Sequence, residues 1–330
     1  MILASSASSS SSPVPSIRSH EHYPATPPFT MGSTALPYLK TNPKVIFFTD
    51  FDGTITLEDS NDHMTDNLGF GGERRRQLNK DVLENKVTFR DSFRDMLDSV
   101  KNPFNECLDI LRANMHLDPH FAEFYYWAKE NNVPIVVLSS GMVPVIKTLL
   151  ETLLGHPLDD HLTIVANEVE SRDGRDINTP GGWQIKYHDD SHFGHDKSLE
   201  IKPYAAVPFD ERPTLLYAGD GVSDLSAASE TDLLFAKAGK DLITYCEREG
   251  MPYTVFENWS SILATTKDIL SGKTVVKKEQ KAITLSYSYP CWLGTLATQH
   301  VTAYWIRPSA LALSFTPENQ RPLGMTWPSN

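Results

Sequence analysis

Short apolar runs alternate with longer helical patterns along the chain from residue 43 onward. The first run, residues 45–48, is followed directly by polar and turn-forming residues, which is typical of a buried strand. Similar runs follow at 133–138, 214–218, 233–236 and 253–256. Because helical stretches separate most of these runs, the pattern predicts an α/β fold with a Rossmann-like, mostly parallel sheet and helices on both faces.

Two neighbouring segments predict more local features. Residues 162–170 and 183–188 alternate between apolar and polar positions around a turn-rich stretch, so we expect a pair of antiparallel strands. Before them, Gly155 is expected to end a helix whose apolar face is formed by Ile146, Leu149, Leu150 and Leu153.

About 80 residues separate the first two apolar runs, far more than a plain loop in a compact domain. Helical spacing is clear among Phe89, Phe93, Met96, Leu97 and Val100. Asp118 followed by Pro119 predicts an N-cap and a first-turn proline that open another helix. We therefore expect residues 58–128 to form a small helical cap, inserted into a core built from 43–57 and 129–272.

Both ends of the chain lack such patterns. Nine of the first twenty residues are serine and prolines are frequent, so we expect residues 1–42 to form a disordered tail. Its single early arginine and its prolines argue against mitochondrial targeting. Residues 273–330 are expected to form a poorly ordered extension. Its uncharged stretch at 282–306 is long enough for a membrane span, but Pro290 and many polar residues interrupt it, so we expect none.

The net charge and the cysteines of the chain limit the binding partners and the cellular locations that we expect. Lysine and arginine number 30 and aspartate and glutamate 42, a net charge of −12, which argues against a protein held to nucleic acid by phosphate contacts. The three cysteines are scattered singly, so they offer neither a disulfide framework nor a zinc knuckle. We expect a reducing location: the cytoplasm, with the nucleus as a second possibility.

The first candidate for chemistry is the sequence Asp-Phe-Asp-Gly-Thr at 50–54, at the end of the first predicted strand. Along an extended chain, Asp50 and Asp52 face the same side, about 7 Å apart. Ligands of open α/β sheets bind at this edge, so the pair suggests a nucleophile and an acid/base. The alternative is that Asp-Gly simply starts a turn.

Two further candidates are weaker taken alone. Ser139, Ser140 and Gly141 follow the second predicted strand and precede a helix, where a hydroxyl and free N–H groups bind anions, although serine is also a common N-cap. Lys197 lies in a polar loop, and nothing local distinguishes it from a surface lysine. Histidines 188, 192 and 195 precede it without the spacing of a metal site, so we expect a polar loop there.

The last candidate is Gly-Asp-Gly-Val-Ser-Asp at 219–224, which follows another predicted strand. Two acidic clusters at two strand ends can hold a hard divalent cation, and Mg²⁺ typically takes about six oxygen ligands at about 2.1 Å. A site rich in carboxylates and poor in cysteine favours Mg²⁺ over zinc.

Taken in order, these four motifs resemble those of the haloacid dehalogenase superfamily of phosphatases. The resemblance covers residues 43–272 and is closest to the phosphoserine-phosphatase-like branch. Within that branch, four sequences are similar to a fungal subgroup that includes a polyol phosphatase: Phe-Thr-Asp-Phe-Asp-Gly-Thr at 48–54, Leu-Glu-Asp-Ser-Asn-Asp at 57–62, Phe-Gly-His-Asp-Lys-Ser at 193–198, and Gly-Asp-Gly-Val-Ser-Asp-Leu-Ser-Ala-Ala at 219–228.

The resemblance implies a role for each motif residue. Asp50 would attack phosphorus, and Asp52 would protonate the leaving group and then activate water. Ser139 and Lys197 would hold the phosphoryl oxygens. Mg²⁺ would bind Asp50, the backbone carbonyl of Asp52, and Asp220, whereas Asp224 would orient Lys197 or a metal-bound water. The flanking residues expected at the phosphate are Gly53, Thr54, Ser140 and Gly141.

Substrate choice is expected to come from the cap. Phosphoserine phosphatases of this branch use a cap glutamate and a cap arginine, where this chain has Asp59 and Met96. A substrate carboxylate would then lack its partner, so a phosphorylated polyol or sugar is favoured. The residues expected to contact it are Glu58, Asp59, Asn61 and Arg90. The alternatives are a diketone phosphate of methionine salvage, a phosphoprotein, or a non-catalytic binder of phosphorylated metabolites.

Overall fold

The computed structural model describes residues 36–276, 283–285 and 301–303. Its main sheet has seven strands in the order β4-β3-β2-β1-β5-β6-β7, all parallel except β4, which runs antiparallel to β3. The strands are β1 (Val45–Thr49), β2 (Ile135–Met142), β3 (Leu162–Ser171), β4 (Trp183–Lys186), β5 (Thr214–Gly219), β6 (Leu233–Lys237) and β7 (Thr254–Phe256). The predicted α/β class and the antiparallel pair are confirmed. Strands β8 (Ile283–Leu285) and β9 (Val301–Ala303) pair with each other.

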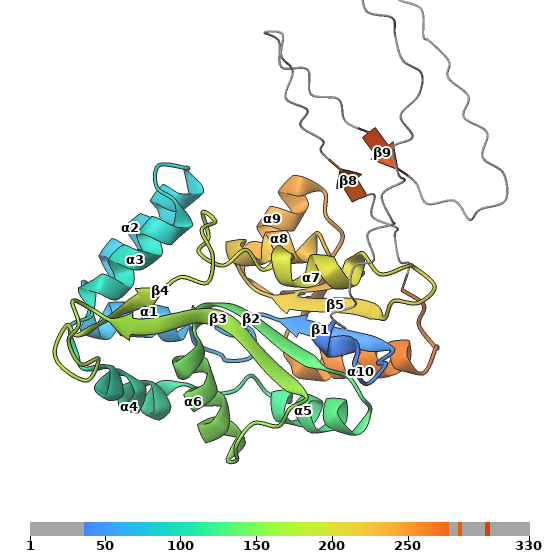
Figure 1. The fold of residues 1–330 in the computed structure, drawn as a ribbon, viewed down its shortest axis with the longest axis horizontal. Helices are drawn as coiled ribbons and strands as arrows, with labels where there is room; N and C mark the ends of the chain where they lie inside the picture. The colour runs from blue at the N-terminus through green and yellow to red at the C-terminus, as the bar shows by residue number, and fades with distance from the viewer. Residues whose placement is uncertain (1–35, 277–282, 286–300, 304–330) are drawn as a thin grey trace, which may run out of the picture. The chain divides into compact units, whose positions relative to one another are not determined.

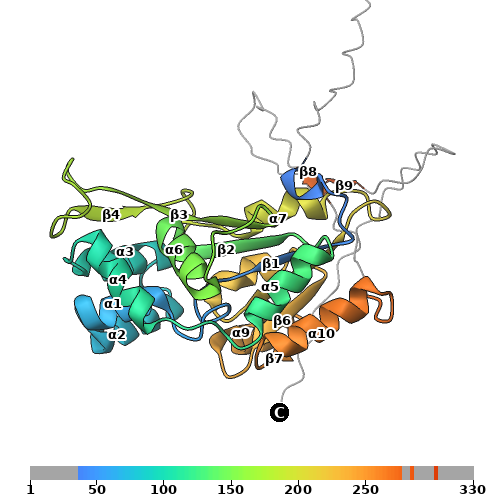
Figure 2. The same cartoon turned by 90° about the horizontal axis from the view of Figure 1, so that it is seen from below.

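Helices cover both faces of this sheet (Figures 1 and 2). Successive residues of β1 point to opposite faces: Phe47 belongs to one apolar cluster, and Ile46 and Phe48 belong to the other. The Phe47 face is covered by α5 (Phe121–Glu130), α6 (Val143–Leu154) and α10 (Trp259–Leu270). The opposite face is covered by α7 (Ser198–Ala205), α8 (Leu225–Ala228) and α9 (Asp241–Glu249). As predicted, α6 ends at Gly155, whose φ of 78° suits a residue without a side chain.

The strand order brings the predicted motifs to one edge of the sheet. Thr49, the last residue of β1, pairs with Val137 of β2 on one side and Ala218 of β5 on the other. Strands β2 to β4 lie on one side of β1 and strands β5 to β7 lie on the other. The carboxyl end of β1 is therefore the point where the strand order reverses. Ligands of open α/β sheets bind at such a point.

The cap consists of α1 (Ser60–Leu68), α2 (Gly72–Leu83), α3 (Phe89–Ser99) and α4 (Phe104–Asn114). The predicted insert at 58–128 includes one helix too many, because α5 packs on the core sheet. The ring of Phe124 lies 4.7 Å from that of Phe47 in β1 and 4.8 Å from that of Trp259 in α10. The aromatic face of α5 is therefore buried against the sheet. Helical periodicity alone does not reveal this long-range contact.

The predicted N-cap role of Asp118 is wrong. Helix α5 begins at Phe121 after His120, which has a left-handed φ of 71°. The buried carboxylate of Asp118 instead forms an ion pair with Lys237 of β6 and accepts a hydrogen bond from the Trp259 N–H at 3.0 Å. Asp118 therefore joins the start of α5 to β6 and α10.

The folded chain also begins earlier than predicted. A short 3₁₀ helix, η1 (Pro37–Leu39), precedes β1, and the ring of Tyr38 stacks on Tyr204 of α7 at 5.0 Å. Residues 36–42 of the predicted tail are therefore part of the described fold, and residues 1–35 lie outside the described residues. Most of the predicted extension at 273–330 also lies outside them. Within the described ranges, no helix is both long and apolar enough to cross a bilayer.

Candidate active site

Lys197, which nothing local distinguishes in the sequence, lies at the centre of the site. Its ammonium donates to Oδ1 of Asp50 at 2.7 Å and to Oδ1 of Asp224 at 2.6 Å. The side chain of Lys197 is fully buried. Its burial disfavours the charge, but attraction first by Asp224 and then by Asp50 outweighs this, so the pKa of Lys197 is raised. The lysine therefore remains an ammonium next to the candidate nucleophile.

The carboxylate of Asp224 is fully used by hydrogen bonds within the protein. Its Oδ1 accepts from Lys197 and from the hydroxyl of Tyr217 at 2.6 Å. Its Oδ2 accepts from the backbone N–H groups of Asp220 and Gly221, both at 2.9 Å. Of the two roles expected for Asp224, this geometry favours orienting Lys197. Tyr217, which sequence analysis missed, is a buried residue of β5 that supports this carboxylate.

Asp50 and Asp220 provide the oxygen ligands that a hard cation requires. One carboxylate oxygen from each of Asp50, Asp220 and Asp224 lies within 4.8 Å of the others. Gly53 passes so close that a Cβ there would lie 2.1 Å from Oδ2 of Asp220, so the backbone closes around this carboxylate. Burial raises the pKa of Asp50 well above its usual range, and Lys197 opposes the rise. A donor set made only of oxygen fits Mg²⁺.

Lys240 is a second cation that sequence analysis missed. Its ammonium lies 3.1 Å from Oδ2 of Asp220, and it follows β6 in a loop at the edge of the site. Burial and then repulsion by Asp224 raise the pKa of Asp220 to about 6, whereas Lys240 lowers it. A sequence signal for Lys240 is absent because its position depends on β6 lying beside β5.

Asp52 is held by the first turn of the cap. Its Oδ1 accepts from the Ser60 N–H at 2.7 Å, and its Oδ2 accepts from the side-chain amide of Asn61 at 2.9 Å. Burial and then repulsion by Asp59 raise the pKa of Asp52 well above its usual range. A carboxyl group that retains its proton at higher pH is suited to act as a general acid.

Ser139 and Ser140 belong to the end of β2, not to the start of a helix. Helix α6 begins four residues after Ser139, with Met142 at its N-cap position. The backbone carbonyl of Ser139 accepts from Nδ1 of His195 at 2.9 Å, and that of Ser140 accepts from the side-chain amide of Asn167 at 2.6 Å. The hydroxyl of Ser140 is buried without a partner among the described residues, at the border of the cavity.

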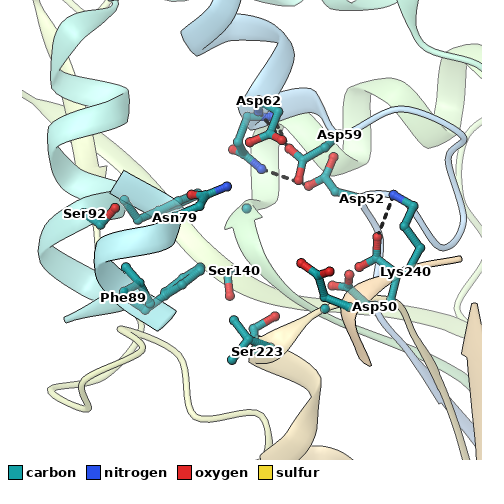
Figure 3. Close-up of a pocket in the computed structure, with 18 of the residues that line it drawn as sticks. Asp50, Asp52, Asp59, Asp62, Asn79, Phe89, Ser92, Ser140, Ser223 and Lys240 are labelled. Atoms are coloured by element: carbon teal, nitrogen blue, oxygen red, sulfur yellow. Dashed lines mark hydrogen bonds and ion pairs between the residues drawn. The ribbon is translucent and has the colours of Figure 1, made fainter. Parts of the chain in front are cut away.

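A cavity of about 300 Å³ lies between core and cap. The predicted residues that line it are Asp50, Asp52, Asp59, Asn61, Ser139, Ser140, Gly141 and Asp220. Figure 3 shows Asn79, Ser92 and Phe89 of the cap facing Asp50, Ser140 and Ser223 of the core. The other cap residues on its wall are Asp62, Val82, Leu83, Phe93 and Met96. Asp50, Asp52 and Ser139 thus share this cavity with the cap residues, whereas Lys197 is not on its wall and contacts Asp50.

Two residues predicted to contact substrate point elsewhere. Glu58 accepts hydrogen bonds from the backbone N–H of His116 at 2.9 Å and from its ring nitrogen at 3.0 Å. The guanidinium of Arg90 donates to the carbonyl of Asp189 at 2.7 Å and lies over the ring of Tyr187. Neither borders the cavity, so the structure does not bring these two residues together with the other predicted ones. Their polarity is satisfied by protein groups, which spacing along the sequence does not show.

Gly53 and Thr54 also lie outside the cavity wall. Gly53 packs against Asp220, as described above, and the carbonyl of Thr54 accepts from the indole N–H of Trp259 at 2.9 Å. The two residues therefore shape the turn after β1, and the expected direct contact with phosphate is not seen in the cavity lining.

The chain is similar to several known proteins. The profile of the haloacid dehalogenase-like hydrolases matches residues 47–229. The chain is 51% identical over 215 residues to Pdp3-interacting factor 1 of Schizosaccharomyces pombe, an alignment that covers 65% of this chain and 91% of that protein. It is 48% identical over 239 residues to polyol phosphate phosphatase PYP1 of Saccharomyces cerevisiae, covering 71% and 97%.

The fold is also found in a crystal structure of a HAD-family hydrolase from Salmonella enterica serovar Typhi. That structure has a TM-score of 0.50 and 18% identity, and the match covers 67% of this chain and 70% of the other. The family resemblance predicted from the four motifs is confirmed by the profile match and by both yeast relatives. The chain belongs to the haloacid dehalogenase-like hydrolase family.

Proposed function

We propose that this hydrolase is a Mg²⁺-dependent phosphomonoesterase that acts on a small phosphorylated polyol or sugar. The observation that carries the proposal is the pairing of Asp50 with the buried ammonium of Lys197, beside a second carboxyl group, Asp52, with a raised pKa. Phosphoryl transfer to a carboxylate requires three groups: a nucleophile, a positive charge that neutralises the phosphate, and a general acid.

Mg²⁺ would be held by the carboxylates of Asp50 and Asp220 and by the backbone carbonyl of Asp52. When bound, it would supply positive charge that neutralises the phosphoryl oxygens. Lys197 supplies a further positive charge from the protein. Together they would allow the anionic Asp50 to approach an anionic phosphate ester.

The reaction would proceed in two steps on the side chains of this chain. In the first, a carboxylate oxygen of Asp50 bonds to phosphorus, the ester P–O bond breaks, and Asp52 gives its proton to the departing alkoxide. In the second, Asp52 takes a proton from water, whose oxygen bonds to phosphorus. The bond between phosphorus and the Asp50 oxygen then breaks, which releases inorganic phosphate and restores the Asp50 carboxylate. Ser139 and Lys197 would hold the phosphoryl oxygens throughout, while the cap limits entry of bulk water.

The cavity wall favours an uncharged leaving group. Beyond the catalytic aspartates it carries Asp59 and Asp241, whereas its Asp62 is paired with Arg75 at 2.6 Å, and its cation, Lys240, is paired with Asp220. These carboxylates would repel a substrate that bears a second anionic group, and they can accept hydrogen bonds from hydroxyls. The name of the 48% identical yeast relative, a polyol phosphate phosphatase, supports the same substrate class.

A diketone phosphate from methionine salvage is the second candidate. The apolar side chains of Phe89, Phe93 and Met96 on the cap wall favour it, since they would pack against a thioether chain. A phosphoprotein is disfavoured, because a cavity of about 300 Å³ between core and cap has little room for a polypeptide.

A panel of phosphate esters at fixed Mg²⁺ tests the proposal. Sorbitol 6-phosphate and glycerol 3-phosphate are compared with phosphoserine, the diketone phosphate and a phosphopeptide. We expect kcat/KM for a polyol phosphate to exceed that for phosphoserine by at least about tenfold, the scale of one unpaired charge. Faster turnover of the diketone phosphate would favour the second candidate.

The same assay includes two controls for the chemistry. Chelation by EDTA and the variant Asp50→Asn should each abolish turnover, because one removes the cation and the other removes the nucleophile. Turnover that survives both would overturn the proposal. Tight binding of a phosphate ester without any turnover would instead support a non-catalytic regulator.

A further inference from the structure

The loop of residues 187–196, here called the clasp loop, touches the cap at one end and the catalytic centre at the other. It follows β4 and ends directly before Lys197. On the cap side, the Arg90 backbone N–H in α3 donates to the carbonyl of His192 at 2.9 Å. The Arg90 guanidinium donates to the carbonyl of Asp189 at 2.7 Å. One cap residue thus binds the loop through both its backbone and its side chain.

Tyr187 makes this attachment reciprocal. Its hydroxyl donates to the backbone carbonyl of Arg90 at 2.5 Å, and its ring lies beneath the Arg90 guanidinium at 4.4 Å. The neighbouring cap residue, Phe89, has its ring 6.3 Å from that of Phe193 in the loop. Hydrogen bonds in both directions, a cation–π contact and an aromatic contact therefore join the start of α3 to the clasp loop.

The far end of the loop contacts the residues that are expected to bind phosphate. His195 donates to the carbonyl of Ser139 at 2.9 Å, and Lys197 donates to Asp50 at 2.7 Å. The His188 N–H donates to the side-chain oxygen of Asn167 at 2.8 Å, and the amide of Asn167 donates to the carbonyl of Ser140 at 2.6 Å. The loop thus fixes both serines of β2 and the lysine expected to hold phosphate.

The loop is internally braced by hydrogen bonds and by close packing. The Asp189 carboxylate accepts from the Ser191 N–H at 2.8 Å and from the Asp196 N–H at 2.7 Å. Gly194 has a φ of 76°, and a Cβ there would lie 2.1 Å from the ring of Tyr187. Only glycine fits this position without displacing Tyr187. The ring that contacts the cap is therefore also packed against the loop's own backbone.

Helix α3 carries part of the substrate wall. Four of its residues border the cavity: Phe89, Ser92, Phe93 and Met96. Arg90 on the same helix forms hydrogen bonds with the clasp loop. We propose that Arg90 and Tyr187 are positioning residues, which fix the cap wall relative to Lys197 and Ser139 and so couple cap closure to the geometry of phosphoryl transfer. The inference rests on the proposed function, because that proposal assigns Lys197 and Ser139 to the phosphoryl group.

Three variants and a matched control test the coupling. Arg90→Ala removes the guanidinium, Arg90→Lys retains a cation, and Tyr187→Phe removes only the hydroxyl. The control is Arg94→Ala, one turn further along α3. The Arg94 guanidinium also lies over the Tyr187 ring, at 5.3 Å, but forms its ion pair with Asp91 of the same helix.

We expect Arg90→Ala to lower kcat about tenfold for both sorbitol 6-phosphate and p-nitrophenyl phosphate, because misplacement by a fraction of an ångström is costly in such sites. The inhibition constant of inorganic phosphate should rise, and amide hydrogen exchange should accelerate across residues 191–199. Tyr187→Phe should show a smaller loss of the same kind, Arg90→Lys should recover part of kcat, and Arg94→Ala should remain within about twofold of the parent protein.

Melting temperature separates coupling from simple stabilisation. If Arg90→Ala and Tyr187→Phe lower the melting temperature yet match Arg94→Ala in kcat, phosphate inhibition and exchange, the residues only stabilise the cap and the inference is overturned. Failure of the proposed function would look different: the parent protein itself would hydrolyse no phosphate ester. In that case, unchanged exchange at 191–199 in Arg90→Ala would still refute the coupling, and accelerated exchange would still support it.

Discussion

At the scale of single residues, the site is governed by how buried charges are partnered. Lys197 lies between Asp50 and Asp224, and Asp224 is completed by Tyr217 and two backbone N–H groups. Removing one member of such a set leaves the other charges desolvated and unpaired. This explains why a lysine without any local sequence signal is fully buried at the centre of the site.

The raised pKa of Asp52 leads to a prediction about pH. As general acid, Asp52 must carry its proton when the leaving group departs, so kcat/KM should fall as pH rises through its pKa. After burial itself, repulsion by Asp59 contributes most to raising this pKa. The variant Asp59→Asn should therefore shift the alkaline limb to lower pH, while asparagine still caps the N-terminus of α1.

The measurement is a pH profile of kcat/KM on an alkyl phosphate for the parent, Asp59→Asn and Asp52→Asn. Asp52→Asn should lose about 10²–10⁴ in rate and also lose this limb. p-Nitrophenyl phosphate, whose leaving group is a weaker base, should be less affected. An alkaline limb that persists unchanged in Asp52→Asn would show that another group titrates.

At the scale of elements, one buried ion pair joins the start of helix α5 to the core. Asp118 before α5 pairs with Lys237 of β6 and accepts from the backbone of Trp259 in α10. The Asp118 side chain is fully buried and that of Lys237 nearly so. The pair therefore fixes three elements that are far apart in sequence.

Replacing Asp118 should destabilise the fold strongly. Asp118→Ala leaves the Lys237 ammonium buried without its partner, which typically costs about 3–5 kcal/mol of unfolding free energy. The matched control is Asp109→Ala in α4, whose pair with Arg112 is exposed and should be worth less than about 1 kcal/mol. Urea unfolding of both variants provides the measurement. Equal losses would show that the buried pair contributes no more than a surface pair.

At the scale of the whole molecule, core and cap form one continuous site within the described part of the chain. The cavity takes residues from α1, α2 and α3 of the cap and from the ends of β1, β2 and β5 of the core. All residues that line it lie between positions 50 and 245. The alignment with the Saccharomyces cerevisiae phosphatase, which spans 239 residues, covers 97% of that protein.

We therefore expect a chain of residues 36–276 to retain the activity. It contains the seven-stranded sheet, the cap and the contact of Tyr38 with Tyr204. Its kcat/KM should lie within about twofold of that of the full chain, since surface changes remote from a site usually have small effects. A chain of residues 43–276, which removes the Tyr38 contact, should melt at a lower temperature. Loss of activity from 36–276 with an unchanged circular dichroism spectrum would assign a functional role to the removed ends.

Local patterns in the sequence were sufficient to predict the strands, the antiparallel pair and the placement of Asp50, Asp52 and Asp220 after strands at one edge of the sheet. Each depends on neighbours a few residues away: apolar period, turn residues and a carboxylate after a strand. The tertiary structure alone decided the partners of Lys197, the support from Tyr217, the position of Lys240 and the placement of α5. These depend on which strands lie beside β1 and on which charges must be neutralised away from water, and neither is encoded within any short segment. For the same reason, sequence analysis expected Arg90 to contact the substrate, whereas its guanidinium binds the clasp loop.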